Sequence, residues 1–511
     1  MAASARPTRN TSPNPSGPGP AHGGGAEDAA GPHDAANLEF TPAEMRAMGE
    51  QVLERVLAHL QSLPEQPACG DVHAEALCRA LREDDAPEDG ASLPSLLAPL
   101  FDEWVGRSFT TPGPGYLAFI PGGGLYAAGL ADLIADTTNR FTGVWKAAPA
   151  LVQLEANVLA WLADWMGFPR ASRGLLTSGG SMANFAGVVC AREKVLGTAL
   201  RDGVLYTSEQ AHHCIAKAAR LAGILHDRVR LVGVDGQFRM RTDLLAAAIA
   251  RDRAAGLRPF LVVSTAGTTN TGAVDPLEPI AELCARERLW HHVDGAYGAF
   301  FHMVPELRLL LAGLPRADSL ALDPHKGLFL PYGTGALLVR EGADLRAAHA
   351  GHAAYLPPTP EGDEFYDPSQ YSAELSRPFR GLRVWLAVKL HGAARLRAAV
   401  AEKRVLAVDA AARLARVPGL RMVAPPQLSL FAFHLAWSGA SRDDENAATR
   451  ELMERVVARQ RVMITGCEVD GRVLARVCVL SFRTRRDRVD MAVQDIAEEA
   501  AAVLAARGAA P

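Results

Sequence analysis

The stretch Gly174-Leu175-Leu176-Thr177-Ser178-Gly179-Gly180-Ser181 decides the fold class of this chain. A short strand, residues 174–177, runs into a glycine turn, and a helix is predicted from Ser181 to Leu196. Glycines let the backbone approach a ligand closely, and a helix N-terminus presents unpaired N–H groups with a partial positive charge. The turn is therefore either a phosphate cradle or an ordinary strand-to-helix connection. It lacks the Lys-Ser/Thr of a Walker A loop and the third glycine of a dinucleotide fingerprint.

Strands and helices alternate on both sides of this stretch. Helices are predicted at 150–165, at 212–221 and from Thr242, and strands at 204–207, 229–234, 260–265, 289–293 and 319–322. Such alternation favours an α/β fold with a mostly parallel sheet and helices on both faces. Ligands of such sheets bind beyond the carboxyl ends of the strands. After Arg380, a long helical stretch, strand candidates at 428–434 and 474–482 and a helix at 489–504 predict a smaller α+β domain.

The N-terminal part of the chain differs from the rest in composition. Residues 1–36 are rich in Pro, Gly, Ala, Ser and Asn. They cannot bury enough apolar surface to offset the entropy of ordering, so we predict a disordered tail. Structure is predicted to begin at Thr41-Pro42-Ala43-Glu44, which combines an N-cap, a proline at the first helical position and a capping-box glutamate. A helix with an apolar stripe follows, formed by Met45, Met48, Val52, Val56 and Leu60.

The overall composition is that of a globular protein with a sizeable core. The 511 residues are 49% hydrophobic and 22% charged, with a formal charge of −4. This balance gives no reason to expect nucleic acid or an anionic membrane as a partner. We find no apolar run long enough for a membrane span and no secretory signal. The seven cysteines are scattered without a C-x-x-C pair, which favours reduced thiols and a cytoplasmic location over a disulfide framework or a zinc ribbon.

A lysine follows the strand predicted at 319–322, within Asp323-Pro324-His325-Lys326-Gly327. The apolar residues 327–330 come directly after it, so we expect Lys326 to be partly desolvated. Desolvation lowers the pKa of an ammonium group and makes the amine available as a nucleophile. The alternative is a surface lysine in a loop.

A carboxylate ends another predicted strand, in His291-His292-Val293-Asp294. Side chains alternate between the faces of a strand, so His292 and Asp294 share one face. A carboxylate at this position can hold a cationic ring nitrogen. One alternative is a metal site completed by His212 or His213, although no other residues have ligand spacing and we expect no metal. An ordinary buried hydrogen bond accounts best for His291.

A histidine follows the strand predicted at 204–207, within Gln210-Ala211-His212-His213. Either imidazole can stack on a ring or transfer a proton near neutral pH, but a histidine in a loop is more often structural. The groups predicted at the other strand ends favour a functional role for this histidine over a structural one. A phosphate cradle, a carboxylate, an activated lysine and a histidine are together the groups that pyridoxal phosphate (PLP) needs.

Five segments resemble, in order and spacing, the group II pyridoxal-phosphate-dependent decarboxylases, the family of the aromatic-L-amino-acid and glutamate decarboxylases. They are Thr177–Ser181, Gln210–His212, Gly267–Thr269, His292–Tyr297 and Asp323–Lys326. The resemblance extends from about Leu38 to about Leu504. It implies the PLP-dependent transferase fold type I (aspartate-aminotransferase-like), with a mostly parallel seven-stranded sheet in the large domain and a small C-terminal α+β domain. It also implies a homodimer with shared active sites.

The resemblance further implies a division into domains. After the tail at 1–36, a helical segment at 37–110 would pack on the dimer partner. A large PLP-binding domain would occupy 111–380, and a small α+β domain would occupy 381–511.

Site residues follow from the resemblance position by position. Lys326 would form the Schiff base with the cofactor, Asp294 would pair with the pyridine nitrogen, and His212 would stack on the ring. Thr269 would bond near the ring oxygen or the substrate carboxylate. Further cofactor contacts would come from Gly180, Ser181, Ala296 and His325.

A tyrosine on a mobile loop protonates the substrate carbon in relatives, and Tyr355 stands at the matching place. The alternative is that Tyr355 is one of several loop aromatics. The loop onward to Tyr371 is rich in Pro, Gly and acidic residues, as is expected of a lid.

The substrate side of the site is expected in residues 116–124, which resemble the aromatic-substrate segment of the family. Phe119, Ile120 and Pro121 would contact the substrate. The glycines at 122–124 are less polar than recognition of a side-chain carboxylate requires, which favours an aromatic or neutral apolar L-amino acid. Many relatives have Asn in place of Asp323. A carboxylate near a phosphate is unfavourable, so contact between Asp323 and the phosphate stays an open question.

The expected reaction is decarboxylation of an L-amino acid to the amine and CO2. One alternative keeps the cofactor but deaminates oxidatively to an aldehyde, or transaminates. Aldehyde-forming members tend to alter the loop tyrosine or the ring histidine, and both Tyr355 and His212 are present here. Another alternative is a catalytically inactive partner subunit, against which Lys326 and Asp294 together argue.

Overall fold

The computed structural model describes residues 37–70, 74–351, 354–357 and 364–508. The tail predicted at 1–36 lies outside these residues. The chain divides into two compact units, the first ending at Glu54 and the second beginning at Arg55. Helix α1 (Pro42–Ser62) begins in the first unit. Its capping box is confirmed, because the Thr41 N–H donates to the Glu44 carboxylate at 2.7 Å and the Glu44 N–H donates to Thr41 Oγ1 at 3.3 Å.

The second unit contains a seven-stranded sheet of order β1-β7-β6-β5-β4-β2-β3. The strands are β1 (Arg173–Thr177), β2 (Gly203–Ser208), β3 (Val229–Val232), β4 (Arg258–Thr265), β5 (Trp290–Asp294), β6 (Ser319–Leu322) and β7 (Gly335–Val339). Strands β2 to β6 are parallel, and β7 runs antiparallel to both β6 and β1. Strand β1 therefore ends at the same edge as the parallel strands, and the predicted strand ends lie together there.

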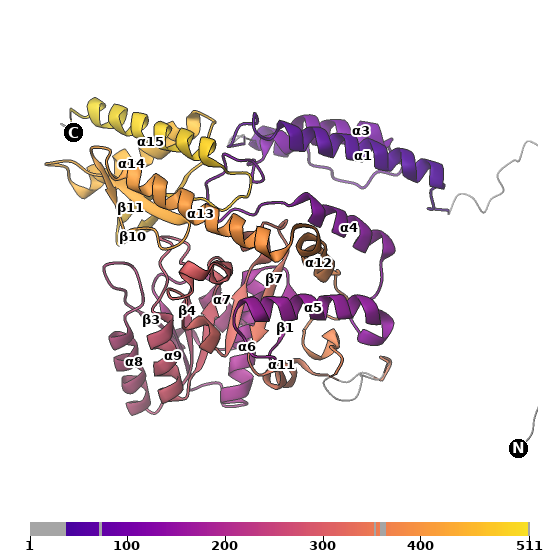
Figure 1. The fold of residues 1–511 in the computed structure, drawn as a ribbon, viewed down its shortest axis with the longest axis horizontal. Coiled ribbons are helices and arrows are strands. Elements are labelled where there is room, and N and C mark those ends of the chain that lie inside the picture. Colours follow the sequence, from indigo (N-terminus) through magenta and orange to yellow (C-terminus); the bar gives the residue numbers. More distant parts are fainter. Residues whose placement is uncertain (1–36, 71–73, 352–353, 358–363, 509–511) are drawn as a thin grey trace, which may run out of the picture. The chain divides into compact units, whose positions relative to one another are not determined.

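Helices cover both faces of this sheet (Figure 1). Helices α6 (Gly180–Leu196) and α7 (Cys214–Leu221) pack on one face, and α8 (Thr242–Ala254) and α9 (Leu277–Glu287) pack on the other. Alternate residues of β4 enter the two cores: Leu261 and Val263 pack with α6 and α7, whereas Val262 packs with α8 and α9. Burial on both faces explains why these strands are nearly continuous apolar runs.

Strand β7 was not predicted. Its five residues are all buried and apolar, with no polar alternation to mark a strand. It follows a short connection from α10 (Pro324–Gly327), so it appeared in the sequence as part of one long apolar stretch.

Several helices frame the large sheet. Helix α5 (Pro149–Trp165) packs on β1, and α12 (Arg380–His391) packs on both α5 and α4 (Tyr126–Thr138). Three further helices are α2 (Glu75–Ala80), α3 (Leu93–Pro99) and α11 (Gly342–His349). Within the described ranges, none of the helices is long and apolar enough to cross a membrane.

The C-terminal part has a sheet of its own, of order β10-β11-β9-β8. Its strands are β8 (Leu420–Met422), β9 (Leu430–Leu435), β10 (Thr465–Val469) and β11 (Arg472–Cys478). All three pairings are antiparallel. The inner strands β9 and β11 were predicted. The edge strands β8 and β10 were missed because they are short and only partly buried.

Helices α13 (Ala393–Leu414), α14 (Arg442–Ala458) and α15 (Arg486–Ala506) pack with this small sheet. The helical stretch predicted after Arg380 is two helices, α12 and α13. Gly392 separates them in a left-handed conformation with φ +76°, which a residue with a side chain adopts only with strain.

Candidate active site

A cavity of about 360 Å³ lies where β1, β4, β5 and β6 end. Eight of the predicted site residues line it, namely Gly180, Ser181, His212, Thr269, Asp294, Ala296, His325 and Lys326. Four other residues line the cavity but were not predicted as site residues from the sequence, namely Met182, Asn184, Cys214 and Thr265. Asn184 follows Gly180 by one helical turn, so helical spacing from the glycine turn is the signal that would have found it.

The glycine turn after β1 forms one wall of the cavity. A Cβ on Gly180 would lie 2.8 Å from the Ala296 Cβ and 2.9 Å from Asp323 Oδ2, so only glycine fits there. The Thr177 hydroxyl donates to the Gly179 carbonyl at 3.0 Å and braces the turn. The first N–H groups of α6 have no carbonyl partner within their helix, and they carry its positive end. This wall can therefore bind an anion.

Lys326 enters the cavity from α10, a single helical turn. Its Nζ donates to Asp323 Oδ2 at 2.9 Å, because residues three apart in a helical turn lie on the same side. Burial acts to lower the pKa of Lys326, but the neighbouring Asp323 and Asp294 carboxylates outweigh it and the pKa is raised. The lowered pKa expected from desolvation alone is therefore wrong. A lysine paired in this way must lose its proton before its amine can act as a nucleophile.

Asp294 ends β5 inside the cavity. Its Oδ1 accepts a hydrogen bond from the Ala296 N–H at 3.2 Å, which fixes the carboxylate at the strand end. His212 faces the same cavity, and its Nδ1 accepts a hydrogen bond from the Cys214 N–H at 3.3 Å. Burial lowers the pKa of His212, against the opposing effect of Asp294. A neutral His212 therefore carries its proton on Nε2.

The two histidines of β5 are structural. His291 Nε2 bonds Ser264 Oγ at 2.8 Å, as the buried hydrogen bond predicted for it requires. His292 bonds Ser319 Oγ at 2.7 Å and Asn184 Oδ1 at 2.8 Å, so both its ring nitrogens are used. Burial lowers the pKa of each to about 3. In the described part of the chain, no three His, Cys, Asp or Glu side chains are placed to hold a metal ion.

His325 and Asp323 lie between the lysine and the glycine turn. His325 Nδ1 donates to the Thr334 carbonyl at 2.8 Å, which leaves Nε2 as the free nitrogen, 3.7 Å from Asp323 Oδ2. Burial lowers the pKa of His325. The Asp323 side chain is 1% exposed. Two buried oxygens of this cavity, Asp323 Oδ1 and Thr265 Oγ1, have no hydrogen-bond partner among the described residues.

This donor set fits pyridoxal phosphate. The α6 turn suits its phosphate, Asp294 suits its ring nitrogen, and Lys326 suits its aldehyde. The buried oxygens without partners are consistent with a site that is completed by a polar ligand. Asp323 is the one group that fits poorly, because its carboxylate borders the anion-binding turn.

Four predicted site residues do not line this cavity. Tyr355 is 78% exposed, and its neighbours 352–353 and 358–363 lie outside the described residues. Phe119 is half exposed, and its ring lies 6.4 Å from those of Tyr116 and Phe109. Ile120 and Pro121 are buried in the same segment. That segment does pass beside the site, because a Cβ on the next residue, Gly122, would lie 2.9 Å from the His325 carbonyl oxygen.

Comparisons with known proteins agree with this geometry. The pyridoxal-dependent decarboxylase conserved domain matches residues 77–436. The aromatic-L-amino-acid decarboxylase of Bacillus atrophaeus is 33% identical over 470 residues, covering 91% of this chain and 97% of that protein.

Solved structures show the same fold. The crystal structure of Oryza sativa TDC with PLP and tryptamine is 26% identical, with a TM-score of 0.85 and coverage of 91% of this chain and 99% of that chain. Rhodiola rosea 4-hydroxyphenylacetaldehyde synthase is also 26% identical, with a TM-score of 0.84 and the same coverage of both chains. The predicted fold class and cofactor are thereby confirmed. The chain belongs to the group II pyridoxal-phosphate-dependent decarboxylases, enzymes of fold type I that release CO2 from an amino acid.

Proposed function

We propose that this enzyme decarboxylates an aromatic L-amino acid to its amine. The observation that carries the proposal is the meeting of Lys326, Asp294 and the α6 glycine turn around one cavity. The aromatic class is supported by the relative from Bacillus atrophaeus and by the tryptamine in the Oryza sativa structure. The glycines at 122–124 beside the site also favour an apolar substrate side chain over a charged one.

Different residues of the cavity would bind different parts of the cofactor. Lys326 would hold it covalently through its amine, and the α6 turn with Ser181 and His325 would bind its phosphate. Asp294 would keep a proton on its ring nitrogen, and PLP, when bound, supplies an electron sink for the pair left by the departing CO2. His212 would stack on the ring, and Thr269 and Ala296 would complete the wall around it.

Asp323 sets the protonation state of the amine. Its carboxylate stabilises the Lys326 ammonium, so the amine becomes nucleophilic only after that proton leaves the pair. The same carboxylate borders the phosphate-binding turn and repels a second anion there. An Asn at this position would avoid both effects, so Asp323 is expected to weaken cofactor binding without abolishing it.

The proton donor and the substrate wall would come from a homodimer. Tyr355 is exposed, and Phe119, Ile120 and Pro121 do not line the cavity of their own chain. We propose that two subunits share each site, with Tyr355 delivering the proton to the substrate carbon. Within this dimer, residues 37–110 would pack on the partner, which is supported by α1 having no buried residue. Residues 111–380 would form the PLP-binding domain and 381–511 the small domain.

We also propose a cytoplasmic location. All seven cysteines are free thiols, which supports a reducing compartment.

The test of the proposed reaction is incubation of the PLP-loaded protein with a mixture of the common L-amino acids, followed by mass spectrometry of the products. We expect a single aromatic amine. An amine from a non-aromatic amino acid would correct the substrate class, and an aldehyde with ammonia would replace the reaction by oxidative deamination. A yellow protein that forms no product would contradict the proposed activity.

A further inference from the structure

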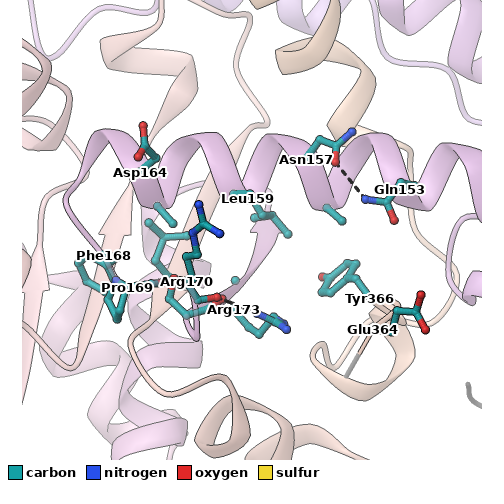
Figure 2. A pocket seen from close by; sticks show the side chains of 16 residues that line it. Gln153, Asn157, Leu159, Asp164, Phe168, Pro169, Arg170, Arg173, Glu364 and Tyr366 are labelled. Atoms are coloured by element: carbon teal, nitrogen blue, oxygen red, sulfur yellow. Dashed lines mark hydrogen bonds between the residues drawn. The ribbon is translucent and has the colours of Figure 1, made fainter. Parts of the chain in front are cut away.

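A second cavity, of about 440 Å³, lies under α5 at the opposite edge of the large sheet from Lys326. Figure 2 shows its walls, which are α5, residues 168–174 and residues 364–366. The length of β1 separates the two cavities, because Arg173 and Gly174 at the start of β1 line this one and Ser178, just after its end, lines the other. Among the residues that the structure describes, none lines both cavities.

One face of α5 forms the roof of this α5 cavity. Ala156, Ala160 and Ala163 recur at helical spacing, and their small side chains leave the space open. The buried side chains of Leu159, Phe168 and Leu338 add apolar surface. The apolar part of a ligand, about as large as one aromatic ring, can therefore pack against this face of α5.

A buried hydroxyl is aimed into the same space. Tyr366 is 7% exposed, and its hydroxyl has no hydrogen-bond partner among the described residues. Such groups in folded proteins almost always find a partner, and a ligand is one way to supply it. Burial and the nearby Glu155 carboxylate raise the pKa of Tyr366, so the hydroxyl keeps its proton and can donate it.

Positive charge lies across the cavity from this hydroxyl. The Arg170 and Arg173 side chains enter the space beside α5 (Figure 2). Arg173 donates to the carbonyls of Arg170 and Ser172. The exposed Arg170 guanidinium has no hydrogen bond or ion pair with any described residue.

We propose that the α5 cavity binds a small monocarboxylate with an apolar body, such as an aromatic acid. Arg170 and the Tyr366 hydroxyl would both donate to the carboxylate, and the body would lie against the alanines of α5. The exposed carboxylates of Asp164 and Glu364 also line the cavity, so a second negative charge on the ligand would be repelled. The cavity should therefore bind a monocarboxylate more tightly than a phosphate or a dicarboxylate, unlike the phosphate-binding turn at Lys326.

Phenylacetate is the probe, because it has no amine that can react with PLP. Its dissociation constant is measured by isothermal titration calorimetry on the PLP-loaded enzyme, with the visible spectrum recorded in parallel. We expect saturable binding without any change in the visible band. Arg170→Gln and Tyr366→Phe should each raise the dissociation constant by at least about fivefold, as loss of a hydrogen bond to a charged group does.

Arg416→Gln is the matched control, because Arg416 is exposed just after the end of α13 and does not line the α5 cavity. It should leave the dissociation constant unchanged. Thermal unfolding of Tyr366→Phe checks its fold. Absence of phenylacetate binding, or binding that survives both Arg170→Gln and Tyr366→Phe, would overturn the proposal. Binding that perturbs the visible band would place phenylacetate at Lys326 and would also overturn it.

Discussion

The two cavities lie at opposite edges of one sheet and are built in different ways. Around Lys326, charged groups of opposite sign are buried and paired, and they follow strand ends where a parallel sheet collects polar side chains. In the α5 cavity the charged groups of Asp164, Arg170 and Glu364 stay exposed, and the buried polar group that lacks a partner among the described residues is the Tyr366 hydroxyl. Paired buried charges suit covalent chemistry on a fixed cofactor. A rim of exposed charges suits reversible binding.

The largest effect is expected when Lys326 of the first cavity is replaced. Lys326→Ala removes the amine that holds the cofactor covalently, so we expect the purified protein to lose the visible band of the Schiff base. Lys217→Ala, on the exposed side of α7, is the control and should stay yellow. If Lys326→Ala kept an unchanged visible spectrum, the cofactor would be held elsewhere.

The next effect concerns the proton donor, which belongs to neither cavity in a single chain. Tyr355→Phe should bind PLP normally but shift the product from amine toward aldehyde and ammonia. The product shifts because protonation of the substrate carbon becomes slower when the tyrosine hydroxyl is removed. Quantifying both products by mass spectrometry checks this. Amine alone, formed at the normal rate, would show that Tyr355 is not the donor.

A buried ion pair joins α5 to Arg377, and neither of its residues lines the α5 cavity. Arg377 and Glu155 are 1% and 0% exposed, and their charged groups are 2.6 Å apart. Arg377→Met leaves the Glu155 carboxylate buried without its partner, which should lower the free energy of unfolding by about 3–5 kcal/mol. Chemical denaturation measures it. The double variant with Glu155→Leu should recover most of the loss, and an equal loss in the double variant would contradict this explanation.

The smallest effect concerns Asp323, the poorly fitting carboxylate of the first cavity. Asp323→Asn removes a charge that both raises the pKa of Lys326 and faces the phosphate turn. The amine should then lose its proton at lower pH, so the midpoint of cofactor attachment should move to lower pH. Cofactor affinity should rise by at least about tenfold, since like charges in a partly buried site repel by more than about 1.4 kcal/mol.

Titrating the apoenzyme with PLP at several pH values, by visible absorption, gives both quantities for Asp323→Asn. An unchanged midpoint and an unchanged affinity would show that Asp323 does not act on either group.

Much of the first cavity could be predicted from the sequence because its residues sit at strand ends in recognisable order. Six of the seven large-sheet strands follow from that pattern, and the eight site residues follow from it together with the resemblance to the decarboxylase family. The direction of the pKa shift of Lys326 could not be predicted, because it depends on the 2.9 Å contact with Asp323. Strand β7 lacked polar alternation, and the short edge strands β8 and β10 lacked a continuous apolar pattern.

The α5 cavity could not be predicted from the sequence at all. Its walls come from one face of α5, the start of β1 and residues 364–366, which are far apart in the chain and share no motif. The α5 alanines are ordinary helix residues, and the environment of the Tyr366 hydroxyl appears only after folding. A site whose residues are far apart in the sequence and belong to no motif can be found only from the structure.

The most direct test of the central claim is to reduce the PLP-loaded enzyme with sodium borohydride, digest it and locate the pyridoxyl group by mass spectrometry. Reduction makes the bond between the cofactor and its lysine permanent. We predict a single modified peptide, carrying the label on Lys326. A label on another lysine, or no label on a protein that was yellow before reduction, would contradict the assignment of this cavity as the cofactor site.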